Sequence, residues 1–298
     1  MNRSEDPKEK KQTGTSLWNL QGLTIWQLFA QSHRRYRENH FGGSCAQFAY
    51  YSLLALAPLL IILIAFSAKL PLDDLIESFE SAIAGGLPRS TVNVLTTQIE
   101  EIQERSSTNL VLVSFIILGI AGTRIFWTIS KALDLAFGVQ HKRRVWIRGG
   151  MALVLTFGVV FLLLLTMVML VIGPMIATFI VETARVPQTQ TSFFFVVRWG
   201  LACLAMLFIA SVVYGVIPNL KLRWQWVTPG SVFATLGWIV ITQGFRIYVE
   251  NFSRYNETYG ALSGVVVLMT WLYFTGAVIL FGGQMNAVIY HKQSEQET

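Results

Sequence analysis

The chain has 298 residues, of which 53% are hydrophobic and only 13% are charged, and its mean hydropathy is +0.50. A water-soluble protein carries about a quarter charged residues, so this composition excludes an ordinary soluble domain and predicts one integral membrane domain. The formal net charge is +6, but the cations form no stripe interleaved with aromatic residues, so nucleic-acid binding is not predicted.

The N-terminal region is first polar and then amphipathic. Residues 1–16 are polar, which predicts a disordered cytoplasmic tail without a cleavable signal, so that the first span acts as its own insertion signal. Residues 17–31 place Leu17, Trp18, Ile25, Trp26 and Phe29 mainly on one helical face, and the cationic stretch HRRYR follows. This pattern predicts either a helix lying in the cytoplasmic membrane interface or a helix packed against the bundle.

Six apolar runs are long enough to cross a bilayer as helices. Outer-membrane strands would instead alternate polar and apolar residues over about ten positions, a pattern that these runs do not show. The predicted fold is therefore all-α, an integral membrane six-helix bundle within residues 17–290, followed by a cytoplasmic tail at 291–298. The runs cover approximately residues 43–68, 109–130, 150–181, 194–217, 227–249 and 261–290.

The placement of Lys and Arg orients these spans, because short cationic loops stay on the cytoplasmic side. Cations gather before the first span, in the loop at 139–148 and in the loop that contains Lys221 and Arg223. The opposite loops hold fewer cations, so both termini are expected in the cytoplasm. The longest external loop, residues 70–108, contains two capped amphipathic segments separated by GGLP, which predicts a helical hairpin. Its acidic residues are interpreted as a solvated face, with an ion site as the alternative.

Charged and polar residues within the spans are the candidate functional groups, because a central charge costs about 2.5–3.5 kcal/mol on insertion scales. Helical spacing places Arg124, Lys131 and Asp134 on roughly one face of the second span. We expect these three to converge with other polar groups near the cytoplasmic ends of the spans, forming a vestibule. The alternative is an interfacial Lys131–Asp134 ion pair, with Arg124 extending to water. The other vestibule residues are Gln47, Gln284 and Asn286.

Aromatic residues and glycines mark the outer entry to the last span. Tyr259 is predicted to anchor at the outer interface and Trp271 to anchor or pack, while Gly260 and Gly264 lie one turn apart. Two glycines at this spacing allow a neighbouring helix to approach closely, and a flexible outer gate is the alternative interpretation. Pro58 lies inside the first span, where it frees a backbone carbonyl and can kink the helix.

Several blocks of the chain resemble the YihY/virulence factor BrkB family. The first span, CAQFAYYSLLALAPLLIILIAF, is similar to the family signature of small residues, a tyrosine pair at Tyr50 and Tyr51, and a proline at Pro58. GTRIFWTISKALDLAFGV, TYGALSGVVVLMTWLY and FGGQMNAVIY resemble its other blocks. The resemblance implies a six-helix protein of the bacterial inner membrane. Ala55, Asp134 and Gln284 depart from the usual family residues, and a neutral amide at position 284 can orient a substrate but cannot titrate.

The family was once labelled ribonuclease BN, but the residues do not predict an enzyme. Metal-dependent RNA cleavage needs clustered His and carboxylate ligands. The four histidines, at positions 33, 40, 141 and 291, show no ligand spacing, and no Ser or Cys lies in a nucleophile motif. No catalytic residue, metal or cofactor is predicted.

Two functional classes remain open from the sequence. The first is a transporter or translocator of an anionic lipid or ion, with Arg124 facing a cytoplasmic-side vestibule. The second is a non-transporting membrane scaffold or assembly factor that docks through the N-terminal helix and the external hairpin. Membrane lipids with anionic headgroups are the expected partners, nucleic acid is not, and homo-oligomerisation is left undecided.

Overall fold

The computed structural model describes residues 17–18, 20, 22–67, 108–139, 144–184, 191–218, 225, 227–251 and 261–296. Within these ranges the chain forms seven α-helices and no strand, which confirms the all-α prediction. The predicted tail at 1–16, the external hairpin at 70–108, and Tyr259 and Gly260 lie outside the described residues. The helices are α1 (Ile25–Glu38), α2 (Phe41–Ser67), α5 (Thr108–Ala136), α6 (Val145–Ala184), α7 (Thr191–Val216), α8 (Pro229–Asn251) and α10 (Ala261–Gln296).

The six helices after α1 coincide with the six predicted apolar runs to within a few residues at most ends. Among the described residues, four stretches are long and apolar enough to cross a membrane: Phe41–Phe66, Thr108–Ala136, Trp146–Leu165 and Gly264–Gln296. Helix α7 contributes a shorter apolar stretch, Met206–Val216. The chain is therefore a membrane protein built from apolar helices.

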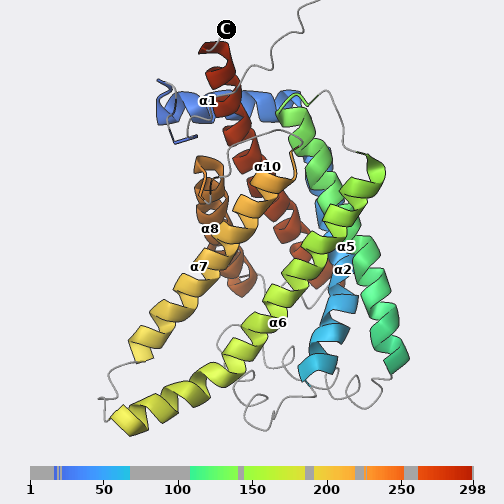
Figure 1. Ribbon diagram of the computed structural model, residues 1–298, viewed down its shortest axis with the longest axis vertical. Coiled ribbons are helices and arrows are strands. Elements are labelled where there is room, and N and C mark those ends of the chain that lie inside the picture. The colour runs from blue at the N-terminus through green and yellow to red at the C-terminus, as the bar shows by residue number, and fades with distance from the viewer. Residues whose placement is uncertain are drawn as a thin grey trace, which may run out of the picture.

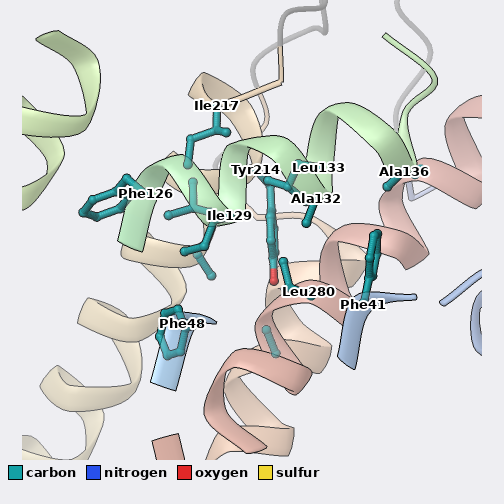
Figure 2. Packing of buried hydrophobic residues seen from close by; sticks show 14 of the residues in the cluster. Phe41, Phe48, Phe126, Ile129, Ala132, Leu133, Ala136, Tyr214, Ile217 and Leu280 are labelled. Carbon is teal, nitrogen blue, oxygen red and sulfur yellow. The ribbon is translucent and has the colours of Figure 1, made fainter. Parts of the chain in front are cut away.

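Helix α10 is the central element of the assembly. It packs against α2 and α8 along much of its length, and against α1 and α5 as well (Figure 1). Helix α2 also packs extensively on α5, α6 packs on α5, and α7 packs on α8. The core lies where these helices meet, with Phe41 and Phe48 from α2, Leu133 from α5, Tyr214 from α7 and Leu280 from α10 (Figure 2).

Helices α8 and α10 cross so closely that glycine is required at the contact. A Cβ atom on Gly282 would lie 2.5 Å from the backbone oxygen of Gly230 and 2.6 Å from the Tyr214 hydroxyl. A Cβ atom on Gly230 would in turn collide with the backbone oxygen of Gly282. The Tyr214 hydroxyl donates a 2.6 Å hydrogen bond to the backbone oxygen of Ile279, so α7 is joined to α10 at the same level. Small residues thus bring backbones together without a hydrophobic driving force between helices in lipid.

Helix α1 begins later than predicted. The expected helix covered residues 17–31, but the helix starts at Ile25, after a turn in which Gly22 has a φ of +78°. Thr24 occupies the N-cap position, and its backbone N–H donates to the Gln27 side chain at 3.0 Å. The preceding segment is held elsewhere, because the Trp18 indole N–H donates to the backbone oxygen of Val227 at 2.9 Å. Tertiary contacts with the start of α8 therefore override the continuous amphipathic pattern.

The structure shows the N-terminal helix packed against the bundle, which was one of its two interpretations, and a position in the membrane interface stays a prediction. Helix α1 lies across the end of the assembly at which α10 ends (Figure 1). Leu28 is buried and packs with Met285 and Val288 of α10. The opposite face leaves Ile25 and Trp26 about three-quarters exposed, at 74% and 75%. The helix thus packs on the bundle through one face and leaves an apolar face uncovered.

We expect Gly282→Ala to destabilise the protein, because the added methyl group meets backbone rather than a movable side chain. Overpacking of this kind costs about 1–3 kcal/mol. The matched control is Gly244→Ala in α8, where a Cβ atom meets nothing within 4 Å. Thermal unfolding in detergent should show a lowered midpoint for the Gly282 variant and an unchanged or raised midpoint for the control. Equal midpoints would contradict the close crossing.

Candidate functional site

The three charged residues of α5 do not share one environment. Arg124 and Lys131 are exposed on the surface of the described structure, whereas Asp134 is buried. The Lys131 ammonium lies 6.0 Å from the centroid of the Trp127 ring, one turn before it on the same helix. Among the described residues, Arg124 forms no ion pair. The single face expected for all three residues therefore divides into two exposed cations and one buried acid.

Asp134 pairs with Arg148, not with Lys131. The Arg148 guanidinium, at the start of α6, donates to one carboxylate oxygen of Asp134, and the two side chains are only 12% and 5% exposed. The other oxygen of Asp134 has no hydrogen-bond partner among the described residues. The backbone oxygen of Asp134 accepts from Val139 at 2.9 Å, which closes the turn after α5. This buried pair ties together the two helices on either side of the cationic loop.

Gln284 connects α10 to the end of α1. Its side-chain oxygen accepts a 3.0 Å hydrogen bond from the Asn39 amide, and the side chain is fully buried. Its amide nitrogen has no partner among the described residues, and neither has the buried hydroxyl of Ser32 on α1. The neutral Gln284 thus presents an unused hydrogen-bond donor inside the protein.

Asn286 organises the start of α8. Its side-chain oxygen accepts from the backbone N–H of Gly230 at 2.9 Å, and its amide donates to the Thr228 hydroxyl at 3.0 Å. Thr228 and Ser231 exchange side-chain and backbone hydrogen bonds across the first turn of α8. All of these groups are buried, so Asn286 satisfies free N–H and hydroxyl groups at a helix start that water does not reach.

The remaining predicted residues are scattered. Gln47 and Tyr50 are exposed on α2, Tyr51 is half-buried against the Tyr50 ring, and Pro58 is buried. Gly264 is exposed, and a Cβ atom there would meet nothing within 4 Å, so the described structure shows no close helix approach at that position. The Trp271 indole N–H donates to Thr242 of α8 at 3.4 Å, which makes Trp271 a contact between α8 and α10.

The six predicted vestibule residues therefore fall into two sets. Gln284, Asn286 and Asp134 are buried and bonded within the bundle, whereas Arg124, Lys131 and Gln47 lie on its surface. Sequence reasoning missed the partners of the buried set, which are Arg148, Asn39 and Thr228. In the sequence, Arg148 is one of the cations of the loop at 139–148, and nothing in the spacing of Asn39 or Thr228 indicates contacts with α10.

Tyr36 and Cys45 form a further polar contact between α1 and α2. The tyrosine oxygen and the thiol sulfur are 3.1 Å apart, and Cys45 is fully buried. Burial, and then the contact with the thiol, raise the pKa of the Tyr36 hydroxyl, so it stays neutral at physiological pH. Within the described ranges, no group of three or more His, Cys, Asp or Glu side chains could hold a metal ion.

Comparisons with known proteins give a consistent family assignment. Residues 32–298 match the family model described as virulence factor BrkB. A Bacillus subtilis protein named putative ribonuclease-like protein YfkH is 32% identical over 87% of this chain and 94% of its own length. A UPF0761 membrane protein of Vibrio parahaemolyticus is 24% identical over 89% of this chain and 82% of its own. One of Rhodospirillum centenum is 27% identical over 86% of this chain, which spans 55% of that relative. No solved structure matches.

The buried Asp134–Arg148 pair gives a direct test of the polar contacts. Arg148→Gln should destabilise the protein by about 3–5 kcal/mol, because it leaves Asp134 buried without a countercharge. The control is Arg144→Gln, which removes an exposed cation one turn earlier. Adding Asp134→Asn to Arg148→Gln should recover part of the loss, since no buried charge then remains. Unfolding midpoints measured in detergent would contradict the pairing if both single arginine variants behaved alike.

Proposed function

Because this chain belongs to the virulence factor BrkB family and is built from apolar membrane helices, we propose that it moves an anionic lipid or ion across the bacterial inner membrane. In this proposal the protein is a six-span bundle with both termini in the cytoplasm, and α1 lies in the cytoplasmic interface. It is a translocator and not an enzyme, and Arg124 is the group that binds the anion within the membrane. The relatives reported above come from bacteria, which supports the inner-membrane location.

The observation that carries this proposal is the exposure of Arg124 within a membrane-spanning helix. Helix α5 has 29 residues and is therefore about 43 Å long, and Arg124 stands sixteen residues after its start at Thr108. An arginine at this depth stays charged and is costly to leave against hydrocarbon. Among the described residues no carboxylate neutralises it. An anion held by the planar guanidinium would remove that cost through paired hydrogen bonds.

The polar groups at the cytoplasmic end support the same direction of approach. The cationic loop around Arg144 and the exposed Lys131 raise the local concentration of anions at that end. Gln284, which connects α10 to Asn39 at the end of α1, adds a buried amide donor that has no partner among the described residues. We place the anion first at the exposed cations of α5, and we assign the buried amides the role of holding the helices in register.

The interfacial position of α1 is supported by its two faces. Its exposed Ile25 and Trp26 suit the boundary between headgroups and acyl chains, while Arg34 and Arg37 suit lipid phosphates. The exposed apolar face with Ile25 and Trp26 would also serve the scaffold alternative, in which α1 docks a partner protein. That alternative becomes the better explanation if the cations of α5 prove dispensable in a transport assay.

The proposed orientation predicts which ends of the helices are accessible from outside the cell. Asn109 is exposed at the start of α5, and Ser294 is exposed near the end of α10. In variants whose native cysteines, Cys45 and Cys203, are replaced, Asn109→Cys should react with an impermeant maleimide in intact cells. Ser294→Cys should react only after the membrane is permeabilised. The reverse pattern would overturn the orientation.

The proposed anion site predicts a graded response at Arg124. Arg124→Gln should insert and fold normally, since it removes an intramembrane charge, but should reduce transport about tenfold or more if one charge-assisted contact of roughly 1.5–3 kcal/mol is lost. Arg124→Lys should recover only part of the activity, because a point charge replaces a planar fork. Complementation and flux in reconstituted vesicles, normalised to protein level, measure this. Full activity of Arg124→Gln would remove the main support for transport and favour the scaffold.

A further inference from the structure

We propose that the anion is the headgroup of a membrane phospholipid held on the outer, bilayer-facing side of α5, where it passes between Lys131 and Arg124, and not a soluble ion held inside the bundle. This assignment rests on the proposed function and narrows its substrate class. It is carried by the pattern of exposure along α5. In Figure 1 this helix lies along an edge of the assembly.

The two cations stand within a continuous apolar surface. Ile116 and Ile120 precede Arg124 on the exposed side of α5 and are 64% and 61% exposed, and Leu135 beyond Lys131 is 55% exposed. Side chains of this kind at a membrane-spanning depth are covered by acyl chains. A molecule that reaches Arg124 along this side therefore keeps apolar chains in the bilayer and brings only its charged group to the protein. A soluble ion would have to leave water to take the same path.

The spacing of the cations suits two successive positions of one phosphate. Arg124 and Lys131 are seven residues apart, two turns of helix, so they project on nearly the same side with a separation of about 10 Å. If α5 is centred on a hydrocarbon layer of about 30 Å, Lys131 lies near the cytoplasmic boundary and Arg124 about 10 Å deeper. Lys131 is then close to the level of the phosphates of resting lipids, and Arg124, about 3 Å from the centre of the layer, is level with a headgroup midway through its crossing.

The charges on this side of α5 are uniformly positive. The helix contains one acidic residue, Asp134, and that carboxylate is buried and paired with Arg148. Pairing Asp134 inside the bundle leaves Lys131 and Arg124 without a competing anion on their own helix. Trp127, between them, lies within cation–π distance of the Lys131 ammonium, which keeps the lysine beside the helix surface. The exposed side is therefore complementary to an anionic headgroup.

Native mass spectrometry of the full chain with added phosphatidylglycerol, phosphatidylcholine or inorganic phosphate tests this assignment. Phosphatidylglycerol should be retained in preference to phosphatidylcholine, and millimolar inorganic phosphate should not displace it. Arg124→Gln and Lys131→Gln should each weaken that retention about tenfold, whereas Lys131→Arg should keep it. Lys292→Gln, which removes a cation of α10 that pairs with Glu295 at the surface, is the matched control and should change nothing.

Three results would overturn the assignment. One is unchanged phosphatidylglycerol retention in both α5 variants. The second is displacement of the lipid by inorganic phosphate. The third is efficient disulfide formation between two copies carrying Ile120→Cys, which would show that this side of α5 is covered by a second chain. If Arg124→Gln still lowers the flux of a soluble anion, the proposed transport function stands and only the lipid assignment fails; if flux is also unchanged, both fail.

Discussion

The close crossing of α8 and α10 at Gly230 and Gly282 positions several of the buried polar contacts among the described residues. Because neither residue has a side chain, the two backbones meet, and Asn286 one turn further along α10 accepts from the Gly230 N–H and donates to the Thr228 hydroxyl at the start of α8. The Tyr214 hydroxyl enters the same contact from α7. In lipid, helices gain little from burying apolar surface against one another, so such close backbone contacts and buried hydrogen bonds set their arrangement.

From this crossing, α10 extends to the end of the assembly on which α1 lies (Figure 1). Gln284 lies two residues after Gly282 and binds Asn39, which follows the end of α1. Phe281 lies between Phe29 and Tyr36 of α1, with ring centroids 5.2 and 5.7 Å away. Helix α1 is thus held across the end of α10 by both an amide hydrogen bond and aromatic contacts. These contacts also fix the orientation of α1, so its exposed apolar side faces away from α10.

The long helices could be predicted from the sequence, because each is an unbroken apolar run whose length is dictated by bilayer thickness. The start of α1 could not, because residues 17–24 are amphipathic in pattern but are held by Trp18 and Leu17 against residues near the start of α8, about 200 positions away in the chain. The family assignment was also predictable, since the tyrosine pair and the glycine-rich last span are local motifs. Long-range partners leave no such local signal.

The candidate site shows the same division. Periodicity groups Arg124 and Lys131, both of which are exposed, on one side of α5. It also groups the buried Asp134 with them, since a spacing of three residues is compatible with either the same side or the adjacent one. Which of these occurs depends on Arg148, which lies on the next helix and draws the carboxylate inward. The sequence alone therefore does not divide the predicted vestibule residues into a buried and an exposed set, because that division depends on the partner of Asp134.

The separation has a physical consequence for how a charge could cross this protein. A buried cation would need a permanent countercharge, and Asp134 already serves Arg148 in that capacity, so no acid of α5 remains to hold Arg124 or Lys131 inside the bundle. Cations without an acid on their own helix are stable at the protein surface when mobile anions replace the missing partner. Anionic headgroups are the mobile anions that a bilayer supplies in greatest local amount. In the proposed lipid site, the internal pairing of Asp134 leaves the outer side of α5 as the place where the anionic headgroup and the protein cations meet.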